Sequence, residues 1–178
     1  MSENLRPFLP AIAVALIATL FGHGIGVAFG VAEDSMKAAL QAGADEVLAD
    51  KYAGDPAKAK AVVDKSWAYL KRAHLHAGAL GTGALVLAVV LSFLGGGLRL
   101  RQAVAACSSF GAFGYGLFWL VAAFAAPGLG GTGAAKDAYE WLGMPTAALV
   151  VIGTVGGLVL VLAAIVRGMR APTATRTS

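Results

Sequence analysis

The stretch MPTAALVVIGTVGGLVLVLAAI, residues 144–165, decides the fold class, because it contains no charged side chain along its whole length. A helix needs about 20 consecutive apolar residues to cross the hydrocarbon core of a bilayer. Within lipid, every backbone polar group must find its partner inside the protein, and a helix provides those partners within one segment. Residues 144–165 are therefore predicted to form a membrane-spanning helix.

Three further stretches have the same character. Each of the following pairs of charged residues encloses a long segment without Lys, Arg, Asp or Glu: Arg6 and Glu33, Arg72 and Arg99, Arg101 and Lys136. Of the 178 residues, 58% are hydrophobic and only 13% are charged, whereas about a quarter of a soluble globular sequence is charged. We predict an all-α fold, an integral membrane four-helix bundle in a single membrane domain, with spans at about 7–31, 73–94, 102–125 and 144–165.

The connections between the spans carry most of the charges. Residues 32–71 are predicted to form a polar extramembrane loop that contains a helix. Asp55-Pro56 is typical of a helix start, because aspartate caps the first turn and proline suits it, and this helix is expected to run on into the second span. A short interfacial helix is predicted over 136–143, and residues 167–178 are predicted to be a basic, disordered tail.

Charge placement predicts the orientation and excludes one class of partner. Arg99 and Arg101, in a short connection, and the basic C-terminal tail lie close to membrane ends, and such cations favour the cytoplasmic side. We expect a multi-pass protein of the cell (inner) membrane with both termini cytoplasmic. Since no basic stripe is interleaved with aromatic residues, no nucleic-acid partner is expected. The single cysteine, Cys107, excludes an intrachain disulfide.

The three histidines are the leading candidates for function. His23 lies within the first span, while His74 and His76 open the second. Ionisable side chains at membrane depth are costly and indicate a functional site. His74 and His76 are two residues apart and would face nearly opposite sides of a helix, so both cannot bind one ion. A compact zinc site is disfavoured, since no Cys, Asp or Glu joins these histidines, whereas haem needs one or two imidazoles and an apolar slot.

Small residues beside the histidines leave two interpretations open. Gly22, Gly26 and Gly30 recur every four residues, and Gly78 and Gly81 follow the second pair of histidines. Such faces allow close approach of either a neighbouring helix or a planar macrocycle. Arg72 is likewise either a partner for a haem propionate or an ordinary anchor at the membrane end. In span three, Tyr115 and Trp119 lie one turn apart, and their polar tips need partners if buried.

The segment Lys71-Arg72-Ala73-His74-Leu75-His76-Ala77-Gly78 resembles small membrane isomerases typified by styrene oxide isomerase, and is similar to hydroxylaminobenzene mutase. The resemblance covers roughly residues 67–133. It implies four helices, an oligomer and a b-type haem whose axial ligand is the histidine of Arg-Ala-His, here His74. The haem iron of such an isomerase acts as a Lewis acid on an epoxide oxygen before a 1,2-shift. Trp119 stands where those isomerases have a tyrosine, with Tyr115 one turn earlier.

These observations together define the expected site. We expect haem b as the cofactor, His74 as its metal ligand, His23, His76 and Arg72 as further cofactor-binding residues, and Tyr115 and Trp119 as catalytic residues. The expected partners are the lipid bilayer, a small apolar substrate or a redox partner, and further copies of the chain in a homo-oligomer. An open iron site predicts a Lewis-acid isomerase, and two histidine ligands predict a b-type cytochrome. A non-catalytic subunit or assembly factor of a membrane complex is the remaining alternative.

Overall fold

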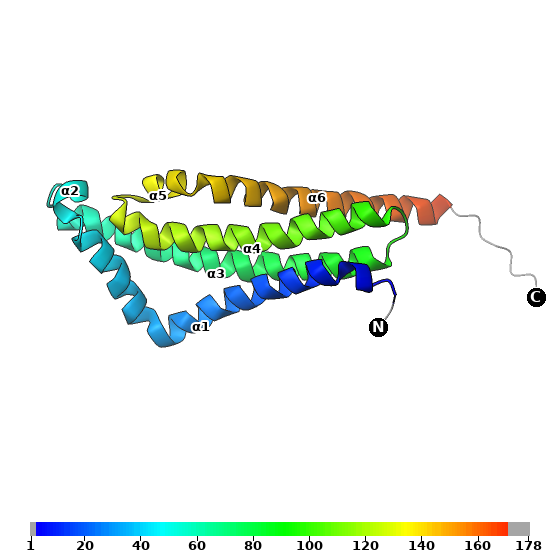
Figure 1. Cartoon of the computed structure of the whole chain (residues 1–178), viewed down its shortest axis with the longest axis horizontal. Coiled ribbons are helices and arrows are strands. Elements are labelled where there is room, and N and C mark those ends of the chain that lie inside the picture. The colour runs from blue at the N-terminus through cyan, green and yellow to red at the C-terminus, as the bar shows by residue number, and fades with distance from the viewer. Residues whose placement is uncertain (1–2, 171–178) are drawn as a thin grey trace, which may run out of the picture.

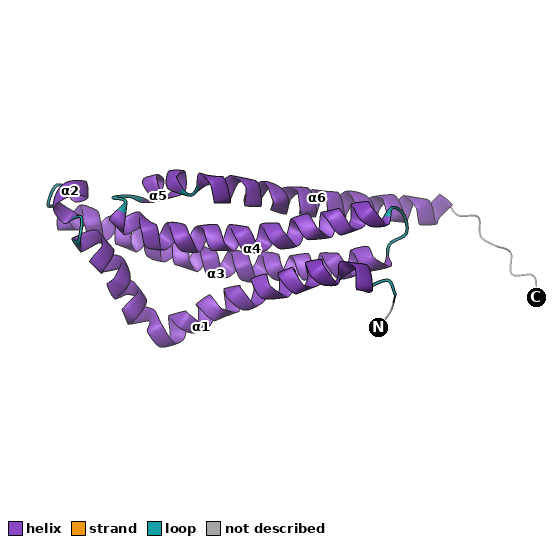
Figure 2. Ribbon diagram, viewed as in Figure 1, coloured by secondary structure: helices purple, strands orange, loops and turns teal. Residues whose placement is uncertain are grey.

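The computed structural model describes residues 3–170, and every regular element in that range is a helix (Figure 1, Figure 2). The elements, in chain order, are η1 (Arg6–Phe8), α1 (Leu9–Asp45), α2 (Leu48–Tyr52), α3 (Pro56–Phe93), α4 (Leu98–Gly128), α5 (Thr132–Ala138) and α6 (Glu140–Arg170). Four of them, α1, α3, α4 and α6, are long and apolar enough to cross a membrane. The predicted all-α fold with four candidate membrane spans is confirmed.

The four long helices form an elongated bundle in which α3 and α4 are central. Helix α1 packs against both α3 and α4, whereas α6 packs mainly along α4. Successive long helices run in opposite directions (Figure 1). The start of α1, the α3–α4 loop and the end of α6 therefore lie together at what we call the terminal end. Helices α2 and α5 lie at the opposite end, the α2 end.

The segment predicted as a polar extramembrane loop with a helix, residues 32–71, is mostly helical. Helix α1 continues through it to Asp45, interrupted by a non-helical backbone at Ala32 (φ −138°, ψ 19°). This interruption bends α1, whose second half returns toward α3 (Figure 1). The predicted helix start at Asp55 is confirmed, since its side chain accepts hydrogen bonds from the backbone N–H groups of Ala57 and Lys58. From there α3 continues without interruption to Phe93.

The region after α4 differs from the short helix predicted over 136–143. Helix α5 ends at Ala138, the backbone of Tyr139 is not helical, and α6 begins at Glu140. A carboxylate in the first turn is favourable because it faces the unpaired N–H groups there, which is consistent with α6 starting at Glu140. Of the predicted tail, residues 167–170 continue α6, and residues 171–178 lie outside the described part of the chain.

Glycines set the close spacing of the helices. A Cβ atom on Gly81 would lie 2.7 Å from the backbone nitrogen of Thr19 in α1, and one on Gly153 would lie 2.5 Å from that of Ser108 in α4. A Cβ on Gly22 would likewise overlap the backbone of Gly78. The helix-packing interpretation of the glycine faces therefore holds at these positions, as small residues permit backbone contact between helices in lipid.

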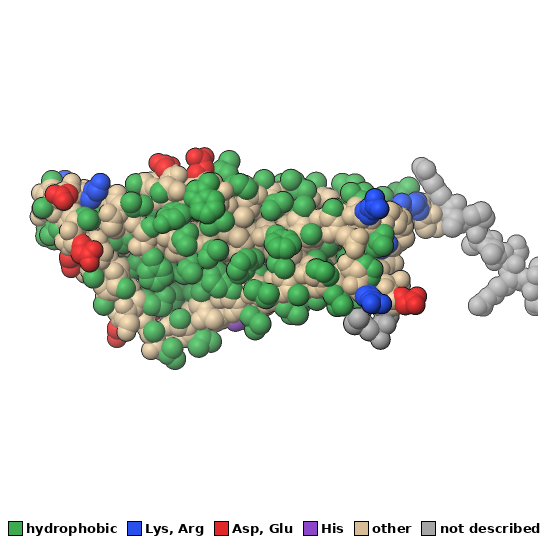
Figure 3. Space-filling view, in the orientation of Figure 1, with side chains coloured by type: hydrophobic (Ala, Val, Ile, Leu, Met, Phe, Trp, Pro, Cys, Tyr) green, Lys and Arg blue, Asp and Glu red, His purple; other side chains and the backbone are tan. Residues whose placement is uncertain are grey.

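Charged side chains gather toward the two ends of the bundle, with apolar side chains over much of the visible length between them (Figure 3). At the terminal end, the Arg101 guanidinium donates a hydrogen bond to the carbonyl oxygen of Leu91 (2.8 Å) near the end of α3. At the α2 end, the buried hydroxyl of Tyr52 donates to the carbonyl oxygen of Pro127 (2.7 Å). These bonds satisfy backbone groups that helix ends leave unpaired.

Candidate functional site

His74 lies in the contact between α3 and α1. Its Nδ1 is 2.8 Å from the carbonyl oxygen of Gly22, and its ring lies so close to Gly26 that a Cβ there would be 2.7 Å from Cε1. The ring of Phe29 meets it edge to face, with centroids 5.8 Å apart. The second half of the first predicted span therefore lies beside the start of the second span. The side chain of His74 is half-buried, with Gly26 and the ring of Phe29 beside it.

His23 follows Gly22 directly in α1, but its side chain is exposed on the outside of the bundle. Nothing in the described chain contacts it through a hydrogen bond or an aromatic ring. In lipid, an exposed imidazole is unfavourable unless another group covers it. His23 is thus close in sequence to the carbonyl that holds His74, yet faces away from the packed interior.

The other predicted residues meet on the α4 side of α3. The His76 ring centroid lies 5.2 Å from that of Tyr115 and 6.0 Å from that of Trp119. The Arg72 guanidinium carbon lies 5.0 Å from the centroid of Trp119 and 5.2 Å from that of Tyr69, within the range of cation–π contacts. We call Arg72, His76, Tyr115 and Trp119 the Arg72 cluster.

The structure therefore separates the six predicted site residues. Four form the Arg72 cluster, His74 lies on the α1 side of α3, and His23 is exposed. His74 and His76 face different neighbours, as their spacing predicted. Tyr115 and Trp119 lie on α4 and contact the face of α3 that carries His76. Within one chain they therefore do not contact the face that carries His74.

The Arg72 cluster holds polar groups without partners in the protein. The Nε1 of Trp119 is buried and makes no hydrogen bond, in a side chain that is only 9% exposed. None of the ion pairs among residues 3–170 involves Arg72. The Nδ1 of His76 is 2.8 Å from the carbonyl oxygen of Arg72, which can only accept, so Nδ1 carries a proton and Nε2 remains available. The Arg72 guanidinium can therefore donate to a ligand with hydrogen-bond acceptors, and the Nε2 of His76 can accept from a donor.

A pocket of about 300 Å³ adjoins this cluster between α4 and the α5–α6 region. Tyr115, Phe118 and Trp119 supply its aromatic wall. Its charged side chains are Lys136, Asp137 and Glu140. Sequence reasoning did not single out these three residues as part of a site. The signal that could have found them was their position, since they are the only charges between spans three and four.

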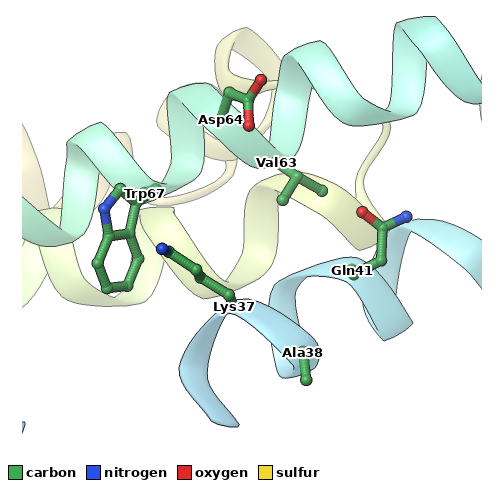
Figure 4. A pocket seen from close by; sticks show the side chains of 6 residues that line it. All are labelled: Lys37, Ala38, Gln41, Val63, Asp64 and Trp67. Carbon is green, nitrogen blue, oxygen red and sulfur yellow. The ribbon is translucent and has the colours of Figure 1, made fainter. Parts of the chain in front are cut away.

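A second pocket, of about 480 Å³, lies between the second half of α1 and the first half of α3, outside the predicted spans (Figure 4). Lys37 and Gln41 extend from α1, opposite Val63, Asp64 and Trp67 of α3 (Figure 4). The Lys37 ammonium lies 5.1 Å from the Trp67 centroid and pairs with Glu33. The hydrogen bond that Lys37 donates to the Glu33 carboxylate raises the pKa of Lys37. The Trp67 face is thus already covered by a cation of the chain itself.

Metal-binding capacity rests on single histidines. Within residues 3–170, no three side chains of His, Cys, Asp or Glu lie close enough together to hold a metal ion. A haem iron requires only one or two protein ligands. His74 and His76 each have Nδ1 held by a backbone carbonyl, an arrangement that leaves Nε2 as a ligand atom.

Comparison of the chain with protein families, with curated proteins and with solved structures gives no match.

Proposed function

We propose that this protein binds haem b in the membrane through His74 and uses it to isomerise a small apolar substrate. The observation that carries the proposal is the 2.8 Å hydrogen bond between His74 Nδ1 and the Gly22 carbonyl. A carbonyl oxygen only accepts, so Nδ1 bears the proton and Nε2 has the free lone pair. Metal-binding histidines are commonly oriented by such a bond, which also raises the basicity of the ligand nitrogen.

The surroundings of His74 suit a flat apolar group. Gly26 offers no side chain next to the ring, and Phe29 supplies an apolar wall. A Cβ on Gly30, one turn after Gly26 on the same face of α1, would meet no atom within 4 Å, so α1 leaves open space there. Lys71 precedes His74 by three residues, on the same side of α3, and can pair with a propionate at the membrane surface.

The chain's own residues would hold the cofactor and exclude water from it. His74 would hold the iron with its ring oriented by the Gly22 carbonyl, and the apolar spans would keep the site dry. When bound, a haem iron with an open position supplies a Lewis acid that polarises an oxygen of the substrate. The isomerase assignment is supported by the resemblance of residues 71–78. The substrate would enter from the bilayer, because the site lies among membrane-spanning segments.

A second candidate, a b-type cytochrome, is favoured by the position of His23. This residue follows the Gly22 carbonyl that holds His74, and its exposed imidazole needs a partner in lipid. If His23 were a second ligand, the haem would supply electron transfer instead of binding a substrate. His76 cannot play this role with His74 in one chain, because it faces α4.

The test is the absorption spectrum of the protein purified in detergent from haem-supplied cells, oxidised and reduced. His74→Ala should lose the haem, whereas the matched variant His76→Ala should keep it. His23→Ala should leave a five-coordinate spectrum unchanged in an isomerase, and should change a six-coordinate spectrum in a cytochrome. Conversion of styrene oxide to the aldehyde, followed by gas chromatography, tests the isomerase activity. A colourless wild-type protein, or haem loss only in His76→Ala, would contradict the assignment of His74.

A further inference from the structure

A membrane-embedded crevice runs between α3 and α6, with α4 as its floor. One pocket of about 290 Å³ is lined by Leu80, Gly83 and Leu87 of α3, Ser108 of α4, and Val150 and Thr154 of α6. A second, also of about 290 Å³, lies on α3 and includes His76. Both pockets include Ala79 and Leu80, so they are parts of one feature, which we call the α3–α6 crevice.

The crevice is closed at its deep end and lies within the span of α3. Leu87 closes it against α6, since a Cβ on Gly157 would be 2.6 Å from the Cδ1 of Leu87. From His76 to Leu87 the helix rises about 16 Å. The lining between these residues is apolar apart from two hydroxyl groups, those of Ser108 and Thr154. A ligand there would be apolar along most of its length.

The open end of the crevice meets the Arg72 cluster. Arg72, His76, Ala79 and Gly83 follow one another at intervals of four, three and four residues, so they lie on one face of α3. The guanidinium of Arg72 takes part in none of the ion pairs of the described chain. A long apolar crevice thus leads to an available cation where α3 leaves the predicted span.

We infer that the α3–α6 crevice binds a fatty acid, with its acyl chain along α3 and its carboxylate at Arg72. Arginine binds carboxylates through paired, charge-assisted hydrogen bonds. Each of the two pockets has a volume of about 290 Å³, at the lower limit of small-molecule pockets, and they follow one another along α3. This suits one extended chain and not the two chains of a phospholipid side by side. Asp137 and Glu140 lie with Lys136 in the neighbouring pocket between α4 and α6, where their negative charges disfavour a carboxylate. The carboxylate therefore lies at Arg72, on the α3 side.

This site is independent of haem, since it lies on the side of α3 opposite to His74. Its ligand binding can therefore be measured whether or not the cofactor assignment holds. His76 belongs both to the Arg72 cluster and to the lining of the crevice, so the fatty acid is a ligand of both.

The inference is tested by titrating myristic acid or tetradecanol onto the full-length protein. Native mass spectrometry counts the ligand molecules bound to each chain. Gly83→Leu fills the crevice without a clash at Cβ, because no atom lies within 4 Å of that position. It should weaken myristate binding at least about tenfold, since it takes the space of the chain. The matched control is Gly24→Leu, on the exposed side of α1, where Cβ also meets nothing within 4 Å. It should bind like wild type.

Arg72→Gln tests the polar end. It should weaken binding of the acid about tenfold and leave binding of the alcohol unchanged, because only the acid offers a carboxylate. Equal binding of acid and alcohol to wild type would overturn the role of Arg72. The crevice would be overturned as the myristate site if Gly83→Leu bound myristate like wild type, or if Gly24→Leu lost binding equally. Absence of myristate binding to the wild type would also overturn it. Displacement of myristate by an equimolar phospholipid would overturn the single-chain assignment.

Discussion

His74 and His76 are two residues apart on α3, yet each contacts a different helix. The Nδ1 of His74 lies 2.8 Å from the Gly22 carbonyl on α1, while the ring of His76 lies 5.2 Å from that of Tyr115 on α4. An α-helix turns about 100° per residue, so two residues differ by about 200°. Helix α3 thus separates two candidate sites, and substitutions can address each of them alone.

The glycine beneath His74 should control cofactor binding. Gly26→Ala places a Cβ 2.7 Å from Cε1 of the ring, so the imidazole must move away from the Gly22 carbonyl. We expect a lower haem content per chain, measured by the pyridine haemochrome spectrum of purified protein. Gly24→Ala, whose Cβ meets no atom within 4 Å, is the control and should retain the wild-type content. Equal haem content in both variants would contradict the proposed site.

The contact of Gly22 with Gly78 should be important for stability. A Cβ on Gly22 overlaps the Gly78 backbone, which cannot rotate away as a side chain can. Gly22→Ala should force α1 away from α3 and destabilise the protein by about 1–3 kcal/mol. The apparent melting temperature in detergent should fall, with Gly24→Ala unchanged. An unaltered melting temperature of Gly22→Ala would show that the two helices are less closely packed than described.

The hydroxyl of Tyr52 joins α2 to the end of α4. It is 3% exposed and donates to the Pro127 carbonyl at 2.7 Å. Tyr52→Phe should cost about 1 kcal/mol, the net value of a typical hydrogen bond, and speed amide exchange in residues 48–54. Tyr139→Phe is the control, because the Tyr139 hydroxyl makes no hydrogen bond within the described chain. Identical exchange in the two variants would contradict this role of Tyr52.

The same residue predicts an alkaline loss of stability. Burial raises the pKa of Tyr52 above its usual value of 10.0, because the ionised form is disfavoured inside the protein. The folded state then binds its proton more tightly than the unfolded state. Its contribution is complete below about pH 10 and is lost as the pH rises toward the folded-state pKa. Melting temperatures measured from pH 8 to 11 should fall less steeply at the alkaline end in Tyr52→Phe.

Arg101 should hold the terminal end of α3 in place. Its guanidinium donates to the Leu91 carbonyl at 2.8 Å and lies 5.7 Å from the Phe8 ring centroid. Arg101→Ala should destabilise this end by about 1–3 kcal/mol, because a carbonyl loses a charged donor. Hydrogen exchange in residues 88–104 should increase. Arg99→Ala removes a neighbouring exposed cation and should change stability and exchange little. If it had the same effect as Arg101→Ala, the loss would come from charge alone and not from the hydrogen bond to Leu91.

The orientation can be tested with two single cysteines in a Cys107→Ala background. Ser35→Cys lies at the α2 end and Gly97→Cys at the terminal end, and both positions are exposed. If the termini are cytoplasmic, as the arginines near the terminal end predict, an impermeant maleimide added to intact cells should label only Ser35→Cys. Gly97→Cys should react after lysis. The reverse pattern would invert the orientation.

The sequence was sufficient for the features that depend on local order along the chain. Long gaps between charges located the four spans, since lipid excludes unpaired charges. Asp55-Pro56 marked a helix start, because capping involves only adjacent residues. The opposite facing of His74 and His76 followed from helix periodicity alone.

Only the tertiary structure decided which helices meet. Periodicity shows that His76 faces away from His74, but the partners that it meets, Tyr115 and Trp119, come from about 40 residues away, on α4. The bend at Ala32 likewise had no sequence signal, because no proline or glycine occupies that position. The packing of α6 along α4 creates the crevice that Leu87 closes against Gly157. Such contacts depend on side-chain shapes from several helices at once, so no single segment determines them.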